Sequence, residues 1–266
     1  MTPKNKKIPL LLIIPHGGYE VPEELSQISG ATPFELFMGA DTCANELFAL
    51  ENHITAKIDS TISRFFIDMD RSYKEISQSH GDGVIKRTSS QGSPLFRKKC
   101  FPDDLAIANM LRRYYFPFHR TIENICATGE IALIVECHTM MPLSAEGPRP
   151  LVAVENRVFS GEEELLTAPP PLGEFLTDHF KKSFAKEEGT IGEKCQLNPP
   201  LPGGIILEKY GLSSIPMLRL SVSKALFINE AHFNHDFLRV DELRIASLRE
   251  RLWKGLEAAT AMAQKL

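Results

Sequence analysis

Residues 10–24 read LLLIIPHGGYEVPEE, and this stretch decides the class of fold that the chain can adopt. The continuous apolar run over residues 8–14 is typical of a strand that is covered on both faces of a sheet. The run stops at a proline and is followed at once by His16 and two glycines. A histidine in this position is either a turn or capping residue, or a metal ligand at the edge of the sheet.

Strand and helix patterns alternate along the rest of the chain. Three further strands are predicted from their β-branched, aromatic and aliphatic residues, at residues 62–71, 130–138 and 216–223. Three helices are predicted from apolar residues spaced three and four apart or from a Pro-Asp-Asp start, at residues 34–50, 102–127 and 241–264. We expect the second helix to be kinked at Pro117. Residues 201–211 are read as a turn into a strand, and residues 72–100, which are polar and rich in glycine and serine, as a long loop.

This alternation predicts an α/β fold with three layers, helix–sheet–helix, around a central mixed and mostly parallel sheet. No linker rich in Pro, Ser or Gly divides the 266 residues, so we expect a single domain over residues 1–266. The composition, 43% hydrophobic and 24% charged, is that of an ordinary globular protein.

Charge and cysteine usage exclude several classes of protein. A net charge of −4 argues against nucleic acid as the main partner. The five cysteines are widely spaced and include no CxxC pair, which argues against a disulfide framework or a zinc ribbon. The apolar run near the N-terminus ends without a small-residue cleavage site, and no stretch approaches transmembrane length. We therefore expect a cytoplasmic protein without membrane contacts.

Polar side chains follow three of the predicted strands. The first strand is followed by His16, the second ends in Asp68, Asp70 and Arg71, and the third ends in Glu136 and His138. In open α/β sheets, ligands bind beyond the carboxyl ends of parallel strands, so these side chains are expected to converge. Two imidazoles and a carboxylate suit zinc with an open position for water, and such a centre hydrolyses amides or esters.

Simpler interpretations remain open beside this one. Asp68 and Asp70 can form a buried ion-pair network with Arg64 and Arg71 instead of a site. His119 lies among aromatic residues on a predicted helix, where a structural histidine is the better prediction. The motifs HExxH, P-loop and GxSxG are all missing from the sequence, which argues against a zincin, a nucleotide-binding protein and a serine hydrolase.

Six segments in order resemble the N-formylglutamate amidohydrolase family, zinc amidases related to the carboxypeptidases. These segments are IPHGGYEVPEE, GADTCANELF, ISRFFIDMDRSY, YYFPFH, LIVECHTM and GGIILEKYG. In the third, Asp70 replaces the family's asparagine, and in the fifth, Glu136 and Thr139 replace an aspartate and a serine. The resemblance implies a phosphorylase/hydrolase-like fold and a small acidic amide as substrate.

The resemblance also implies roles for particular residues. His16 and His138 would bind zinc, with Asp41 as the favoured third ligand and Glu20 as the alternative. A substrate carboxylate would be bound by an arginine, because its planar fork fits a carboxylate. Arg71 is the first candidate for this arginine, and the further candidates are Arg64 and Arg97.

One position departs from the family pattern. Ser221 stands where the last core strand of the family commonly carries a glutamate. Glu136 is then a candidate for the general base, or it only orients His138. Arg219, on the same strand, could favour a differently charged substrate. Two hypotheses follow: a zinc-dependent amidase acting on an N-formyl or N-acyl amino acid, or a catalytically silent relative that binds a small acidic metabolite or a partner protein. The sequence leaves the oligomeric state open.

Overall fold

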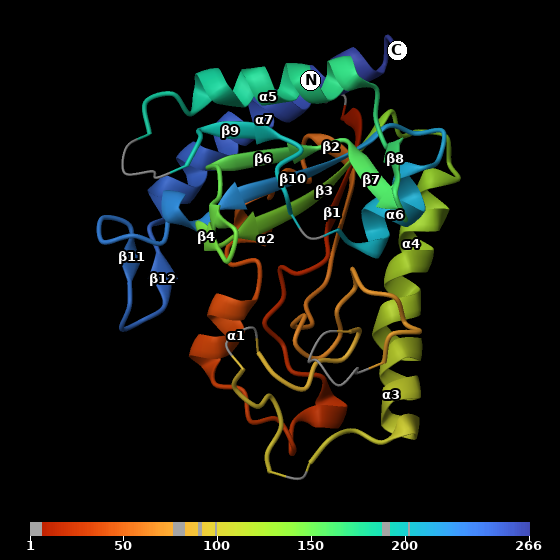
Figure 1. Ribbon diagram of the computed structural model, residues 1–266, viewed down its shortest axis with the longest axis vertical. Helices are drawn as coiled ribbons and strands as arrows, with labels where there is room; N and C mark the ends of the chain where they lie inside the picture. The colour runs from red at the N-terminus through yellow and green to blue at the C-terminus, as the bar shows by residue number, and fades with distance from the viewer. Residues whose placement is uncertain (1–6, 77–82, 90–91, 99, 188–191, 202) are drawn as a thin grey trace, which may run out of the picture.

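The computed structural model describes residues 7–76, 83–89, 92–98, 100–187, 192–201 and 203–266 (Figure 1). At its centre lies a six-stranded sheet with the strand order β2-β1-β3-β10-β6-β9. The strands are β1 (Ile8–Ile14), β2 (Ile54–Asp59), β3 (Leu133–Met140), β6 (Val152–Glu155), β9 (Cys195–Leu197) and β10 (Met217–Ser223). Neighbouring strands are parallel except β10 and β6, which are antiparallel. The predicted mixed, mostly parallel sheet is thus confirmed.

Helices cover both faces of this sheet, as Figure 1 shows. Helices α5 (Pro170–Ser183) and α7 (Glu242–Ala263) pack on one face, where even-numbered residues of β1 such as Leu10 and Leu12 are buried. Leu11 and Ile13 point to the opposite face and pack in a second core. β1 is therefore apolar throughout because both of its faces are covered.

The second core lies between the sheet and a long helical segment. This segment consists of α3 (Asp104–Met110), five π-helical residues (Leu111–Tyr115) and α4 (Phe116–Cys126). The predicted helix is therefore continuous, and the irregularity lies just before Pro117. The Phe116 N–H donates to the carbonyl of Leu111, five residues back, in the π-helical turn that precedes the proline.

The remaining elements are short. The helices are α1 (Pro33–Gly39), α2 (Ala44–Leu47) and α6 (Ile205–Gly211), with 3-10 turns at Glu23–Leu25 and Lys224–Leu226. Three two-stranded ribbons are formed by β4 (Leu143–Ser144) with β5 (Gly147–Pro148), β7 (Arg157–Ser160) with β8 (Glu163–Leu166), and β11 (Phe233–Asn234) with β12 (Arg239–Val240).

Three predicted elements are wrong. The helix predicted at residues 34–50 is broken between α1 and α2, where Ala40 is extended and Cys43 has a left-handed φ of 59°. Residues 62–71 form turns instead of a strand, and the second strand of the sheet is β2. Residues 201–211 were interpreted as a turn into a strand, but Ile205–Gly211 form helix α6.

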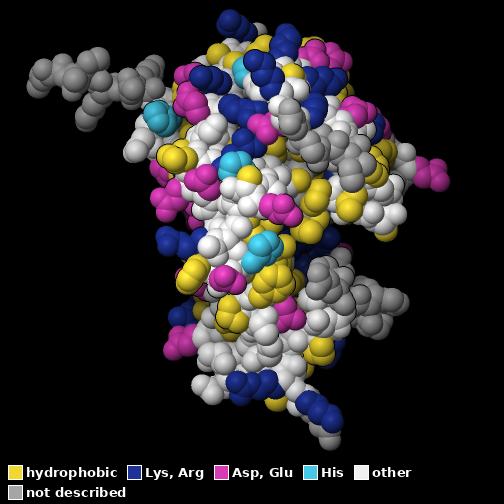
Figure 2. Space-filling model, turned by 90° about the vertical axis from the view of Figure 1, so that its left-hand side faces the viewer, with side chains coloured by type: hydrophobic (Ala, Val, Ile, Leu, Met, Phe, Trp, Pro, Cys, Tyr) yellow, Lys and Arg dark blue, Asp and Glu magenta, His cyan; other side chains and the backbone are white. Residues whose placement is uncertain are grey.

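Three expectations about the class of protein can be compared with the structure. All five cysteines are free thiols. None of the helices in the described part of the chain is both long and apolar enough to span a bilayer. On the face shown in Figure 2, Lys and Arg side chains are interspersed with Asp and Glu, so this face offers no extended surface of one charge.

Candidate metal centre and surrounding cavity

His16 and His138 lie side by side, although they are far apart in the sequence. β1 and β3 are parallel neighbours, so their carboxyl ends meet at one edge of the sheet. His16 is two residues beyond the end of β1, and His138 lies near the carboxyl end of β3. The centroids of the two rings are 5.2 Å apart. The predicted convergence of these two histidines is therefore what the structure shows.

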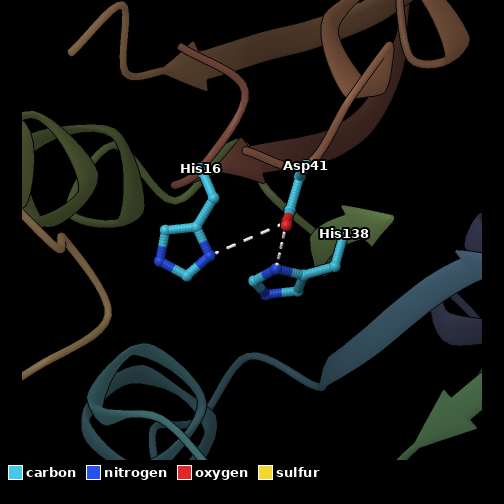
Figure 3. A group of neighbouring side chains, drawn as sticks. All are labelled: His16, Asp41 and His138. Atoms are coloured by element: carbon cyan, nitrogen blue, oxygen red, sulfur yellow. Dashed lines mark hydrogen bonds and ion pairs between the residues drawn. The ribbon is translucent and has the colours of Figure 1, made fainter. Parts of the chain in front are cut away.

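Asp41 completes this group from the break between α1 and α2. The Asp41 N–H donates to the carbonyl of His16 at 2.9 Å, which fixes the carboxylate beside the strand end. The buried Lys224 holds the same loop, because its Nζ donates to the carbonyls of Met38 and Ala40. In Figure 3 the Asp41 carboxylate lies between the two rings.

The donor atoms of these three residues fit a divalent cation. Candidate ligand atoms from His16, Asp41 and His138 all lie within 4.8 Å of one another, and all three residues are buried. His16 Nδ1 is 3.7 Å from Asp41 Oδ2 and has no hydrogen-bond partner among the described residues. A buried nitrogen without a partner is unusual in a protein and points to a ligand. Two imidazoles and one carboxylate are a common ligand set for catalytic zinc.

Each ring is also oriented by a carboxylate of its own, Asp68 for His16 and Glu136 for His138. His16 Nε2 donates to Asp68 Oδ1 at 2.6 Å, so the lone pair of the neutral ring is on Nδ1, which faces Asp41. His138 Nε2 lies 2.9 Å from Glu136 Oε1 and its Nδ1 lies 2.7 Å from Asp41 Oδ2. Carboxylates on the far nitrogen of metal-binding histidines fix the ring orientation in this manner.

The charges of this group favour a cation at its centre. Burial alone would lower the pKa of His138, but Asp41 and then Glu136 raise it to about 10. His138 therefore carries a proton between two carboxylates when no metal is bound. The same two histidines hold the pKa of Asp41 well below its usual range, despite the burial of the carboxylate. A positive charge is thus stabilised between these side chains, whether a proton or a metal ion supplies it.

Arg219 links a further pair of buried acids. Its Nε donates to Glu136 Oε2 at 3.0 Å and its Nη2 donates to Asp70 Oδ2 at 3.2 Å. Although burial opposes ionisation, Arg219 and then His138 lower the pKa of Glu136 to about 2. Burial and the nearby charge of Glu136 raise the pKa of Asp70 to about 6. Asp70 is therefore the member of this pair that takes up a proton first.

A cavity of about 550 Å³ opens over this group, and we call it the central cavity. It is lined by His16, Asp41 and His138, and by Ser221 and Glu155 from the neighbouring strands. The cationic side chains among its described lining residues are Arg64, Arg71, Lys86, Arg149, Arg219 and Lys224. They outnumber the lining carboxylates, Asp41, Asp70 and Glu155. This excess of positive charge suits an anionic ligand.

Of the other predicted site residues, two line the central cavity and two lie outside it. Arg71 lines the central cavity and donates to the carbonyl of Gly203 at 3.1 Å. Arg64 also lines it, but its Nη2 donates to Asp68 at 3.1 Å. Arg97 is exposed and is not among the lining residues. Glu20 is exposed too, and accepts a hydrogen bond from Thr61, so Asp41 is the acid beside the histidines.

Glu136 is completely buried and does not line the central cavity. Its two oxygens accept from His138 and Arg219. This position is that of a group that orients His138, the second role that the sequence left open. The predicted ion-pair network is present in part, since Asp68 pairs with Arg64, while Asp70 pairs with Arg219 instead of Arg71. His119 is structural, as predicted, because its ring nitrogens bond to Tyr210 and the Met69 carbonyl.

Four charged lining residues were missed by the reasoning from sequence, namely Lys86, Arg149, Glu155 and Lys224. Lys86 pairs with Asp68 and comes from the long loop, where no pattern indicates it. Lys224 follows β10 and holds the loop of Asp41 through backbone carbonyls, which carry no sequence signal. Glu155 ends β6, and the short apolar run LVAV at residues 151–154 was a signal that could have found this strand.

Fold and site together define the class of this protein. A mixed α/β sheet carries a His–Asp–His group at its strand ends, beside a cavity with several cationic side chains, and this donor set could hold a divalent metal ion. The sequence model of N-formylglutamate amidohydrolase matches residues 8–228, and the chain belongs to that family. Membership of this family supports amide hydrolysis as the class of reaction.

Solved structures show the same fold. The N-formylglutamate amidohydrolase of Ralstonia eutropha JMP134 superposes with a TM-score of 0.76 at 17% identity, covering 99% of this chain and 96% of that one. A gene product of Agrobacterium tumefaciens superposes with a TM-score of 0.61 at 16% identity, covering 95% and 92%. No curated protein matches the chain.

Proposed function

We propose that the protein is a zinc-dependent amidase that hydrolyses an N-formyl or N-acyl amino acid, or a similar small acidic amide. The observation that carries this proposal is the unpartnered Nδ1 of His16, which faces Asp41 beside His138. A merely structural histidine at this place would have a hydrogen-bond partner for both nitrogens. Membership of the amidohydrolase family supports the reaction class.

His16, Asp41 and His138 are the residues that would hold the metal. When bound, a zinc ion supplies Lewis acidity, which polarises an amide carbonyl and makes water a better nucleophile. Asp68 and Glu136 keep the two rings turned toward Asp41 through their hydrogen bonds. These carboxylates thus preorganise the ligands before a metal or substrate arrives.

Arg71 is our candidate for binding the substrate carboxylate. It lines the central cavity, and its guanidinium is held by the carbonyl oxygens of Asp70 and Gly203. Arg64 donates to Asp68. It therefore adds positive charge to the cavity, but its guanidinium is already used by a carboxylate of the protein. A positioned arginine keeps the scissile amide close to the reacting groups, which lowers the entropic cost of the reaction.

Ser221 favours a second candidate function, a silent relative that binds a small acidic metabolite. This serine lines the central cavity at the strand where the family commonly has a glutamate. Such a protein would bind the metal and the anion without turnover. Both candidates predict the same ligand residues, so activity has to be measured together with metal content.

The test is metal analysis of the purified protein followed by a deformylation assay on a panel of formylated amino acids. We expect about one zinc per chain and turnover that chelation abolishes. His16→Ala and His138→Ala should lose the metal, whereas the control His235→Ala, which changes an exposed histidine, should keep it. Zinc binding without turnover on any member of the panel would favour the silent relative. Wild-type protein that binds no divalent metal would refute both candidates.

A further inference from the structure

A second cavity of about 750 Å³ adjoins the central one, and we call it the side cavity. The two share the lining residues Asp70, Arg71, Glu155, Leu201, Gly203 and Arg219. The side cavity extends from this shared wall toward Arg157 and Phe159 of β7. A ligand whose reacting end lies beside His138 can therefore reach into the side cavity without leaving the protein.

Small side chains lie on the path between the two cavities. Ser221 of β10 is paired in register with His138 of β3 on one side and with Ala153 of β6 on the other. Side chains of directly paired residues point to the same face of a sheet. Ser221 lines the central cavity, and its small side chain leaves open the space next to His138 that a glutamate at position 221 would fill.

Glu155 lies at the end of this path. It is two residues beyond Ala153 on β6, and its Cα is about 12 Å from that of His138, given the usual strand spacing and rise. Glu155 is only 7% exposed, and its buried Oε2 has no hydrogen-bond partner among the described residues. A buried carboxylate oxygen without a donor is costly, so its position at the wall of both cavities points to a donor from a ligand.

The charges of the side cavity agree with a cationic ligand group. Two of its cations already have carboxylate partners, since Arg157 pairs with Glu164, and Arg219 with Glu136 and Asp70. Its lining acids Glu75, Glu155 and Glu208 form no ion pair within the part of the chain that the structure describes. Burial raises the pKa of Glu155, and a bound cation would favour its ionised form.

We propose that Glu155 binds a cationic group of the substrate, so that the amidase acts on N-acyl amino acids with an ammonium or guanidinium side chain. This inference rests on the proposed function and specifies its substrate class. With the acyl group beside His138 and the α-carboxylate on Arg71, the four-carbon stem of a lysine runs past Ser221 toward Glu155. A glutamate side chain in the same place would bring a second negative charge to Glu155.

The test compares three substrates of similar length on the zinc-loaded wild-type protein. These are N-formyl-lysine, its uncharged counterpart N-formyl-norleucine, and N-formyl-glutamate. We expect kcat/KM for N-formyl-lysine to exceed both others about 10- to 100-fold, the range of one hydrogen bond to a charged group. Glu155→Gln should reduce the preference for lysine over norleucine to about twofold or less. The control Glu123→Gln removes the same charge from an exposed residue outside both cavities and should keep the preference.

A binding measurement separates this inference from the proposed function. Calorimetric titration of the protein with L-lysine and with L-norleucine requires no turnover. Tighter binding of lysine that is lost in Glu155→Gln supports the inference, even if no formylated amino acid is hydrolysed and the amidase proposal fails. Equal binding of the two amino acids, or N-formyl-glutamate as the best substrate, overturns the inference while leaving an active amidase. The wild-type comparisons decide the question if Glu155→Gln does not fold.

Discussion

Replacing Arg219 by methionine removes the cation that joins two buried carboxylates. Arg219 is 3% exposed and donates to Glu136 and Asp70 at 3.0 and 3.2 Å. At an effective dielectric constant of about 20, a charge pair at this distance is worth about 5 kcal/mol, much of which offsets desolvation. Removing one partner of a buried pair costs about 3–5 kcal/mol of unfolding free energy. We expect a loss in this range for Arg219→Met at pH 8.

The loss should depend on pH in a direction that the structure fixes. Removing Arg219 removes a charge that lowers the pKa of both carboxyls, so both pKa values should rise, and the pKa of Asp70 is already about 6 with the arginine present. Groups with a raised pKa in the folded state stabilise the fold at low pH and lose that effect as the pH rises. The difference between wild type and Arg219→Met should therefore grow from pH 5.5 to pH 8.

Urea unfolding at both pH values, followed by circular dichroism in the presence of a chelator, measures this difference. Arg219→Lys is the matched control, because it keeps the charge but has no planar fork to bridge two carboxylates. It should lose less stability than Arg219→Met. An equal loss at pH 5.5 and pH 8 would mean that the arginine contributes packing alone, and the charge argument would be refuted.

Three further substitutions test other parts of the structure. A Cβ on Gly204 would lie 1.7 Å from Asp70 Oδ2, so Gly204→Ala should cost about 1–3 kcal/mol in urea unfolding and displace that carboxylate. Burial lowers the pKa of His119 to about 4 in the folded protein. As the pH drops from about 6.5 to 4, His119 is protonated in the unfolded chain before it is in the folded protein, so the free energy of unfolding falls. His119→Gln should reduce this fall in unfolding scans at successive pH values. Phe180 is fully buried under α7, and Phe180→Ala should cost about 3–5 kcal/mol by the same urea assay.

The long apolar strands could be predicted from the sequence because both of their faces are buried. β1 begins and ends where its apolar run does, and the predictions for β3 and β10 hold to within a few residues. β2 was missed, since its six residues include a lysine and an aspartate and contain no such run. Residues 62–71 have the composition of a strand because Phe66 and Ile67 belong to the second core. Turns in this segment, and not a strand, bring the two side chains into that core.

The candidate site could be predicted where it depends on strand ends, and not where it depends on loops. His16 and His138 converge because two parallel strands end together. Asp41 was identified only through the family resemblance, because the helical periodicity of residues 34–50 continues through the break that positions it. Lys86 comes from a long polar loop, and its contact with Asp68 in a neighbouring turn has no periodic signal.

The family resemblance implies departures at positions 70 and 221, and residues of β10 are involved in both. Asp70 adds a buried negative charge, and Arg219 supplies the cation that such a charge requires. Arg219 is paired in register with Glu155 across β6, yet the hydrogen bonds given above direct its guanidinium toward Asp70 and Glu136. Oε2 of Glu155 is therefore left without a hydrogen-bond donor among the described residues. Glu155 and Ser221 both line the central cavity. Asp70→Asn should thus release Arg219 toward Glu155 and weaken the binding of L-lysine, which the same calorimetric titration would detect.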